Sequence, residues 1–273
     1  NYIIGAFGMI FFIAVPYKTW KRFGLAAYIV SFVLCILVIF IGSESHGQAR
    51  WIYIGPIGFQ PSEVAKVGVI VFLAMILERL AKKLKSWKVL GIVFGMLLPI
   101  VGAVAYNNLS TAIIIMGIAV CMLFVASPKY VHFLAVGGVG IVVAVIFILT
   151  AGYRVGRIEA WLHPETADPN AVYQTMQGLY AIGSGGLFGK GLGESLQKLG
   201  NVPESQNDMI FTIICEELGL FGAVCVILLF MLVIWRMMVI SNNAPDLFGS
   251  LLVVGVMSHI AIQVILNIAV VTN

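Results

Sequence analysis

The sequence predicts an all-α, polytopic membrane protein, and three observations support this prediction. Hydrophobic residues make up 61% of the 273-residue chain, charged residues make up only 10%, and the mean hydropathy is +1.05. A soluble domain has about 45–50% apolar and about 25% charged residues, so these values exclude a water-soluble globule. They also exclude a disordered chain, because disorder requires low hydrophobicity. A β-barrel is disfavoured, since its strands alternate in polarity and contain no long apolar runs.

About eight apolar runs are candidates for helices that cross the roughly 30 Å hydrocarbon layer. The first run is short, and it has neither the basic region nor the small-residue cleavage site of a signal peptide. We therefore expect a single transmembrane domain over 1–273, with a long loop at 152–209. The expected spans are 2–16, 23–42, 62–81, 88–106, 109–126, 130–151, 210–236 and 247–270.

Positive charge is concentrated on one side of these spans. One basic cluster (18–22) follows the first run, and another (79–88) follows the third. Because cytoplasmic connections carry an excess of Lys and Arg, these clusters are predicted to face the cytoplasm. The acidic residues partition the opposite way, with only Glu78 and Asp246 on the cytoplasmic side. The net charge of +4 does not by itself indicate a nucleic-acid partner, and we expect none.

The loop at 152–209 therefore lies on the outer side and is long enough to be functional. It contains a glycine series between Gly183 and Gly193, and Ser184 lies within that series. Two interpretations stay open here: the loop either presents backbone N–H groups to an anion or folds as a tightly turned, re-entrant segment. In the same loop, Arg154 and Arg157 are spaced to share one helix face, where guanidinium groups bind phosphate or anchor the chain at the membrane interface.

Acidic residues mark the start of the seventh expected span. Asp208 lies where the loop becomes the span, and Glu216 follows eight residues later on the same helix face. A carboxylate at a helix start is stabilised by the macrodipole, which is a purely structural explanation for Asp208. A carboxylate deeper in a span is costly and usually faces a cavity or a partner.

A second polar set opens the third expected span. Pro61 fits the first helical position and Glu63 the positive end of the helix, as in ordinary capping. Lys66 lies one turn deeper and is predicted to pair with Glu63 or with a bound anion. Asn108 belongs to a further polar cluster on the same outer side, which is also explained by a plain turn with a helix cap.

Four stretches of the sequence resemble the SEDS family (shape, elongation, division and sporulation; FtsW, RodA and SpoVE). They are GQARWIYIGPIGFQPSEVAKV (47–67), NNLSTA (107–112), RIEAWLHPETADP (157–169) and YAIGSGGLFGKGLGESLQKLGNVPESQNDMIFTIICEELGLFG (180–222). The RIEAW and YAIGSGGLFG motifs within these stretches are closer to the division and sporulation branch of the family than to the elongation branch. Since the complete family fold has about ten spans, the resemblance implies a fragment that holds family spans two to nine.

The resemblance implies a peptidoglycan glycosyltransferase that polymerises lipid II on the outer face of the bacterial cytoplasmic membrane, in cell division or sporulation. The family's essential aspartate falls on Asp208, whereas Asn108 replaces an aspartate found in many relatives. The implied partners are a lipid-linked glycan strand, a class B penicillin-binding protein, other division proteins and membrane lipids. The expected substrate-binding residues are Arg50, Gln60, Glu63, Lys66, Asn108, Arg154, Arg157, Gln174, Ser184, Lys198 and Glu216.

In the mechanism we expect, Asp208 is the base that activates the acceptor hydroxyl, and neighbouring cations neutralise the diphosphate that leaves. A divalent cation (Mg²⁺ or Mn²⁺) bridging the diphosphate is compatible with this chemistry, although the sequence contains no evident all-protein metal site. Two alternatives stay open: a lipid II flippase that makes no bond, and a non-catalytic scaffold for the penicillin-binding protein.

Overall fold

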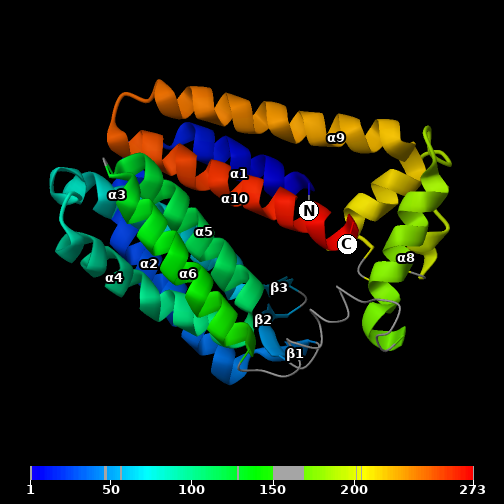
Figure 1. Cartoon of the computed structure of the whole chain (residues 1–273), viewed down its shortest axis with the longest axis horizontal. Helices are drawn as coiled ribbons and strands as arrows, with labels where there is room; N and C mark the ends of the chain where they lie inside the picture. The colour runs from blue at the N-terminus through cyan, green and yellow to red at the C-terminus, as the bar shows by residue number, and fades with distance from the viewer. Residues whose placement is uncertain are drawn as a thin grey trace. The chain divides into compact units, whose positions relative to one another are not determined.

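The computed structural model describes residues 2–45, 48–55, 57–127, 129–149, 169–200, 202–203 and 205–272. Helices account for most of the chain (Figure 1). The α-helices are α1 (Tyr2–Ala14), α2 (Tyr17–Ile41), α3 (Pro61–Leu80), α4 (Trp87–Asn107), α5 (Leu109–Ala126), α6 (Tyr130–Leu149), α8 (Pro169–Gly185), α9 (Ile210–Asn242) and α10 (Leu247–Thr272). Two short 3₁₀ helices cover Ala81–Lys83 and Gln197–Leu199.

Each of the eight expected spans coincides with one of these helices. Among the described residues, five helices are long and apolar enough to cross a membrane, namely α2, α4, α5, α9 and α10. Of the other three, α1 is only 13 residues long, α3 carries four charged residues, and α6 contributes the shorter apolar stretch Phe133–Val142. The prediction of an α-helical polytopic membrane protein is confirmed, while the number of spans stays a prediction.

A small antiparallel sheet lies between α2 and α3, where the sequence was not expected to form strands. Its order is β1 (Ser43–Ser45), β2 (Gln48–Ile54) and β3 (Ile57–Phe59). Ile52 pairs with Phe59 and Ile54 with Ile57 across the β2–β3 hairpin. At Gly55 the backbone has a φ of 62°, which suits glycine because it has no Cβ. The hairpin ends at Phe59, and α3 begins two residues later at Pro61.

The chain divides into two compact units, which are described separately. The first comprises residues 1–140 and 237–259, and the second comprises residues 141–236 and 260–273. In the first unit α3 packs against α2, α4 and α5, and most of its length is buried. At Gly68 an added Cβ would collide with Ser31 Oγ of α2, so the glycine permits close approach of the two helices. This packing fixes the N-terminal end of α3, where Glu63 and Lys66 lie.

Candidate functional site

Asp208 lies in the turn that leads into α9, in the second unit. Its side chain is exposed, whereas its neighbour Met209 is only 2% exposed. The Asp208 carbonyl accepts a hydrogen bond from Asn267 Nδ2 of α10, at 2.7 Å. The backbone of the aspartate is thus anchored while its carboxylate points out of the core, next to the positive end of a helix.

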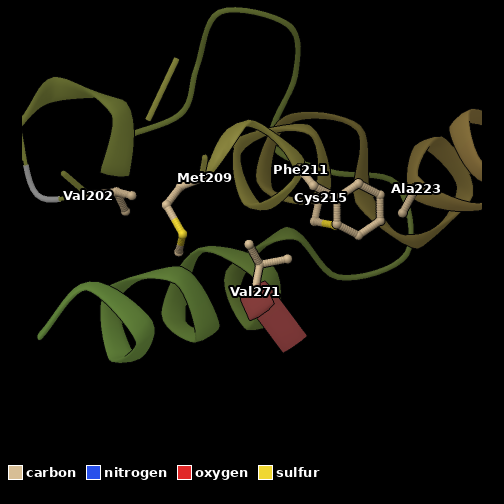
Figure 2. Packing of buried hydrophobic residues seen from close by; sticks show 6 residues of the cluster. All are labelled: Val202, Met209, Phe211, Cys215, Ala223 and Val271. Carbon is tan, nitrogen blue, oxygen red and sulfur yellow. The ribbon is translucent and has the colours of Figure 1, made fainter. Parts of the chain in front are cut away.

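A buried apolar cluster holds the start of α9 in place (Figure 2). Met209 and residues Phe211 and Cys215 of α9 share this cluster with Val202 from the preceding loop and Val271 from α10. Helix α8 adds Gly178, where an added Cβ would meet both Met209 and Thr212, so α8 packs closely on the start of α9. Thr212 is fully buried and donates its hydroxyl to the Met209 carbonyl at 2.7 Å. The position of Asp208 is therefore set by a packed core.

Helix α9 is interrupted at Gly219, which has a φ of 67° and a ψ of −167°. This conformation is essentially restricted to glycine, and the ribbon of α9 changes direction at this end of the helix (Figure 1). A helix break leaves backbone donors and acceptors without their intrahelical partners. In a membrane protein those groups need partners from elsewhere in the chain.

The partners come from the glycine-rich segment 185–196, which we call the glycine loop. The N–H groups of Lys190 and Gly191 donate to the carbonyls of Glu216 and Glu217, at 3.0 and 2.9 Å. In return, the N–H groups of Leu220 and Phe221 donate to the carbonyls of Gly186 and Leu187, at 2.9 and 3.1 Å.

These backbone bonds bear on the two interpretations of the glycine series. The N–H groups of residues 189, 190 and 191 are used by internal carbonyls, so they do not form an anion cradle. An added Cβ at Gly189 would collide with the Glu217 carbonyl, which explains a glycine at this contact. The structure therefore favours the re-entrant segment, which seals the break in α9.

Two ion pairs reinforce the same contact. Glu216 is completely buried, and its carboxylate accepts from Lys190 Nζ at 2.6 Å and from Ser195 Oγ at 2.5 Å. Glu217 pairs with Lys198 Nζ at 2.7 Å. A buried carboxylate is tolerated when it is paired and hydrogen-bonded, as Glu216 is. Glu216 therefore ties the glycine loop to α9, and Glu217 ties Lys198, just beyond the loop, to the same helix.

Several of the predicted site residues belong to this network. Ser184 donates to the Ala181 carbonyl at 3.0 Å and to Glu216 Oε1 at 3.4 Å, and Lys198 and Glu216 have the internal partners given above. A role in binding substrate stays a prediction for all three, and it would require these contacts to be shared or broken. Gln174 lies half-buried on α8. Arg154 and Arg157 lie outside the described residues.

The first unit contains a second polar cluster, where α2 and α4 end and α3 begins. Arg50 of β2 donates from Nε to the Asn107 carbonyl at 3.1 Å. Asn108 caps α5 by accepting from the Thr111 N–H at 3.1 Å, as its structural explanation predicts. Arg50, Gln60 and Asn108 line one small pocket of about 20 Å³, enough for about one water molecule.

Lys66 forms the predicted pair with Glu63, with Nζ and Oε2 separated by 2.8 Å. The lysine side chain is 1% exposed and the glutamate 51% exposed, so the pair runs from the interior of the unit to its surface. A buried ammonium is costly unless it is paired, which accounts for the glutamate one turn away. The prediction that these two residues pair is confirmed, while their contact with a substrate stays a prediction.

Sequence reasoning did not single out Asn267, Lys190 or Ser195. Asn267 is one of few polar side chains in the apolar run of α10, and that isolation was an available signal. Lys190 and Ser195 gave no comparable signal, because their partner Glu216 is distant in the sequence. Among the described residues, no three His, Cys, Asp or Glu side chains are grouped so that they could hold a metal ion.

Long apolar helices, polar side chains collected at helix ends and a break sealed by backbone bonds define a polytopic integral membrane protein. Its sequence matches the family model described as cell cycle protein, FtsW, RodA and SpoVE, over residues 1–273. The chain belongs to this family, so the family predicted from its motifs is confirmed.

Among curated relatives, the stage V sporulation protein E of Bacillus subtilis (strain 168) is 40% identical, and the match covers 99% of this chain and 75% of that protein. A protein of Geobacter sp. (strain M18), named "Probable peptidoglycan glycosyltransferase FtsW", is 34% identical with the same coverage. The chain thus spans about three quarters of the length of these relatives.

Two solved structures share the fold. One is a chain from a peptidoglycan synthase complex that coordinates polymerization and crosslinking, with a TM-score of 0.73, 21% identity, and coverage of 94% of this chain and 73% of that one. The other is the rod shape determining protein RodA of Thermus thermophilus, with a TM-score of 0.66, 23% identity, and coverage of 95% and 69%.

Proposed function

We propose that this chain is the membrane domain of a peptidoglycan glycosyltransferase that joins lipid II units into glycan strands. The observation that supports it most directly is the placement of Asp208. Its carboxylate is exposed at the start of a membrane helix, while its backbone is fixed by Asn267 and by a packed core. A general base needs this combination of access and fixed position. Curated relatives named for the same activity support the proposal.

In the proposed reaction, the 4-hydroxyl of the acceptor sugar attacks the anomeric carbon of the donor strand. Asp208 takes the hydroxyl proton as the new carbon–oxygen bond forms. The bond between the anomeric carbon and the lipid diphosphate breaks, and the diphosphate leaves with the electron pair. An α-linked donor and a β-linked product require one inverting displacement, so a single base is sufficient.

The leaving diphosphate needs positive charge as its own negative charge develops. In the second unit, which contains Asp208, the candidates are Arg154, Arg157 and Lys198. Lys198 already pairs with Glu217, so it would have to exchange that partner for a phosphate oxygen. A Mg²⁺ or Mn²⁺ ion bound by the diphosphate itself would reduce this demand. Activity measured with and without EDTA tests the metal.

We further propose that Asp208 faces the outer side of the bacterial cytoplasmic membrane. The basic clusters at 18–22 and 79–88 favour the cytoplasmic side, and the loop before Asp208 is expected on the opposite side. The proposed partner is a class B penicillin-binding protein, which would crosslink the strands that this domain makes. The likeness to a chain of a peptidoglycan synthase complex supports such a partnership.

The decisive experiment compares Asp208→Asn with the unchanged protein, each as the complete chain with and without candidate penicillin-binding proteins. We expect labelled lipid II to be polymerised by the unchanged protein and not by Asp208→Asn, with partner binding and thermal stability unaltered. Glu194→Gln, an exposed carboxylate on the glycine loop, is the matched control and should remain active. Polymerisation by Asp208→Asn would refute the assignment. Lipid II translocation without polymer would favour the flippase alternative, and partner binding alone the scaffold.

A further inference from the structure

We propose that the glycine loop lies at the membrane boundary, with Leu187 and Phe188 inserted among the lipid acyl chains and the exposed Glu194 on the aqueous side. The proposal concerns a surface in the second unit, and it does not depend on the polymerase activity. It begins from side chains that an aqueous loop would not expose: Leu187 is 64% exposed, Phe188 83% and Leu192 78%.

The level of the loop in the membrane follows from α9. Between Glu217 and Arg236 this helix contains no charged residue. Beyond the break, the uncharged helical stretch 220–235 rises about 24 Å at 1.5 Å per residue, which is most of the roughly 30 Å thickness of the hydrocarbon layer. The break at Gly219 therefore lies at one boundary of that layer, and Arg236 lies at the other.

The glycine loop is fixed at the same level, because its backbone bonds directly to α9 on both sides of the break. Leu187 O accepts from the Phe221 N–H at 3.1 Å, and Gly186 O accepts from the Leu220 N–H at 2.9 Å. Leu220 and Phe221 are themselves 57% and 69% exposed. The apolar surface of the loop is therefore continuous with the exposed apolar surface of a membrane helix, and the lipid that covers one covers the other.

The loop also meets, at five of its backbone groups, the condition that lipid imposes on irregular backbone. Non-helical chain is tolerated at membrane depth only where its polar groups find partners within the protein. The N–H groups of Gly189, Lys190 and Gly191 and the carbonyls of Gly186 and Leu187 have such partners. Lys190, the charged residue nearest to Phe188, is neutralised by Glu216. The backbone groups on either side of Phe188 are thus already paired within the protein when the side chains at 187 and 188 enter lipid.

A spin label at position 188 tests this placement. The complete protein, with Cys121 and Cys225 replaced by alanine and Cys35 and Cys215 kept because they are buried, carries Phe188→Cys. It is labelled and reconstituted into vesicles of phosphatidylethanolamine and phosphatidylglycerol. Collision rates with oxygen, which partitions into lipid, and with a water-soluble nickel chelate are then measured by power saturation.

We expect the label at 188 to collide more often with oxygen than with nickel, as a label at the lipid-facing position 228 should. A label at 206, on an exposed polar stretch of the same unit, should show the reverse. Labelling Leu187→Cys provides a second variant if the first does not fold. Frequent nickel collisions at 188 and 187 would place the loop in water and overturn the proposal. Low rates with both reagents would mean that protein, not lipid, covers this surface, and would overturn it equally.

Discussion

Breaking the Lys190–Glu216 pair by removing the lysine should destabilise the second unit, because it leaves a full charge where water cannot reach it. Glu216 is 0% exposed, and the 2.6 Å contact to Lys190 is its ion pair. Replacing one partner of a buried pair costs about 3–5 kcal/mol, since the other charge is left uncompensated. The lysine is 32% exposed and Ser195 still donates to Glu216, so we place Lys190→Met at the lower end, about 3 kcal/mol.

Substitution of the other partner, Glu216, should destabilise the second unit less. Glu216→Gln removes the buried charge and leaves Lys190 in partial contact with water, so the loss is that of a charged hydrogen bond, about 2 kcal/mol. The double variant lacks both charges and should also lose about 2 kcal/mol rather than the sum of about 5. The expected coupling energy is therefore about 3 kcal/mol.

The measurement is a double-mutant cycle on the complete protein in detergent micelles, unfolded reversibly with SDS. Lys18→Met serves as the control, because Lys18 is 70% exposed and lies 3.7 Å from Asp246. Exposed pairs of this kind contribute less than about 1 kcal/mol. Losses at Lys190 and Glu216 that add to within about 0.5 kcal/mol would refute the reasoning, since additivity indicates independent sites.

Three further predictions concern Gly219, Asn267 and Asp246. Gly219→Ala should destabilise the protein by about 3 kcal/mol or more, because it combines a glycine-only conformation with a collision at Gly189 N; Gly183→Ala, with open space at its Cβ position, is the control in the same SDS titration. Asn267→Leu should lower the polymerisation rate of the complete protein with little change in stability, because it frees the Asp208 backbone; wild-type rates would contradict a positioning role for the amide. The Gly249 N–H, with Tyr17 and nearby lysines, holds the pKa of Asp246 below its usual value. This carboxylate should therefore stabilise the fold at neutral pH and lose that contribution as the pH falls below about 4. Melting temperatures of the protein and of Asp246→Asn should converge in acid.

The long apolar runs were sufficient to locate the membrane helices. Helix α4 was expected at 88–106 and is found at Trp87–Asn107, because about 20 apolar residues in sequence have few other stable arrangements in a membrane. The pair Glu63–Lys66 was equally predictable, since residues three apart share a helix face.

The sheet and α8 were missed for different reasons. The stretch 48–59 is rich in aromatic and β-branched residues and contains a Gly-Pro dipeptide, which is a hairpin signal that does not depend on long apolar runs. Helix α8 mixes glycine, polar and aromatic residues, so it resembles a loop in composition. Its burial against Met209 is a tertiary effect.

The candidate site was predictable only in part. The family motif located Asp208, but the neighbours that fix it, Asn267 and the core around Met209, come from segments far apart in the chain. The same limit applies to Glu216. Its helix face suggested a role beside Asp208, whereas the fold buries it against Lys190 and Ser195, 26 and 21 residues earlier in the chain.

The sealing of the α9 break also bears on the order in which the protein is made. At Gly219, helix α9 leaves backbone N–H and carbonyl groups without hydrogen-bond partners inside the helix. Inserted into the membrane alone, the helix would expose these groups to lipid. The ribosome synthesises residues 186–191 before residues 216–221, and the earlier segment is thus already present when the break leaves the insertion machinery. We therefore expect this helix to be completed in two steps, with the earlier segment supplying the backbone partners on which the later break closes.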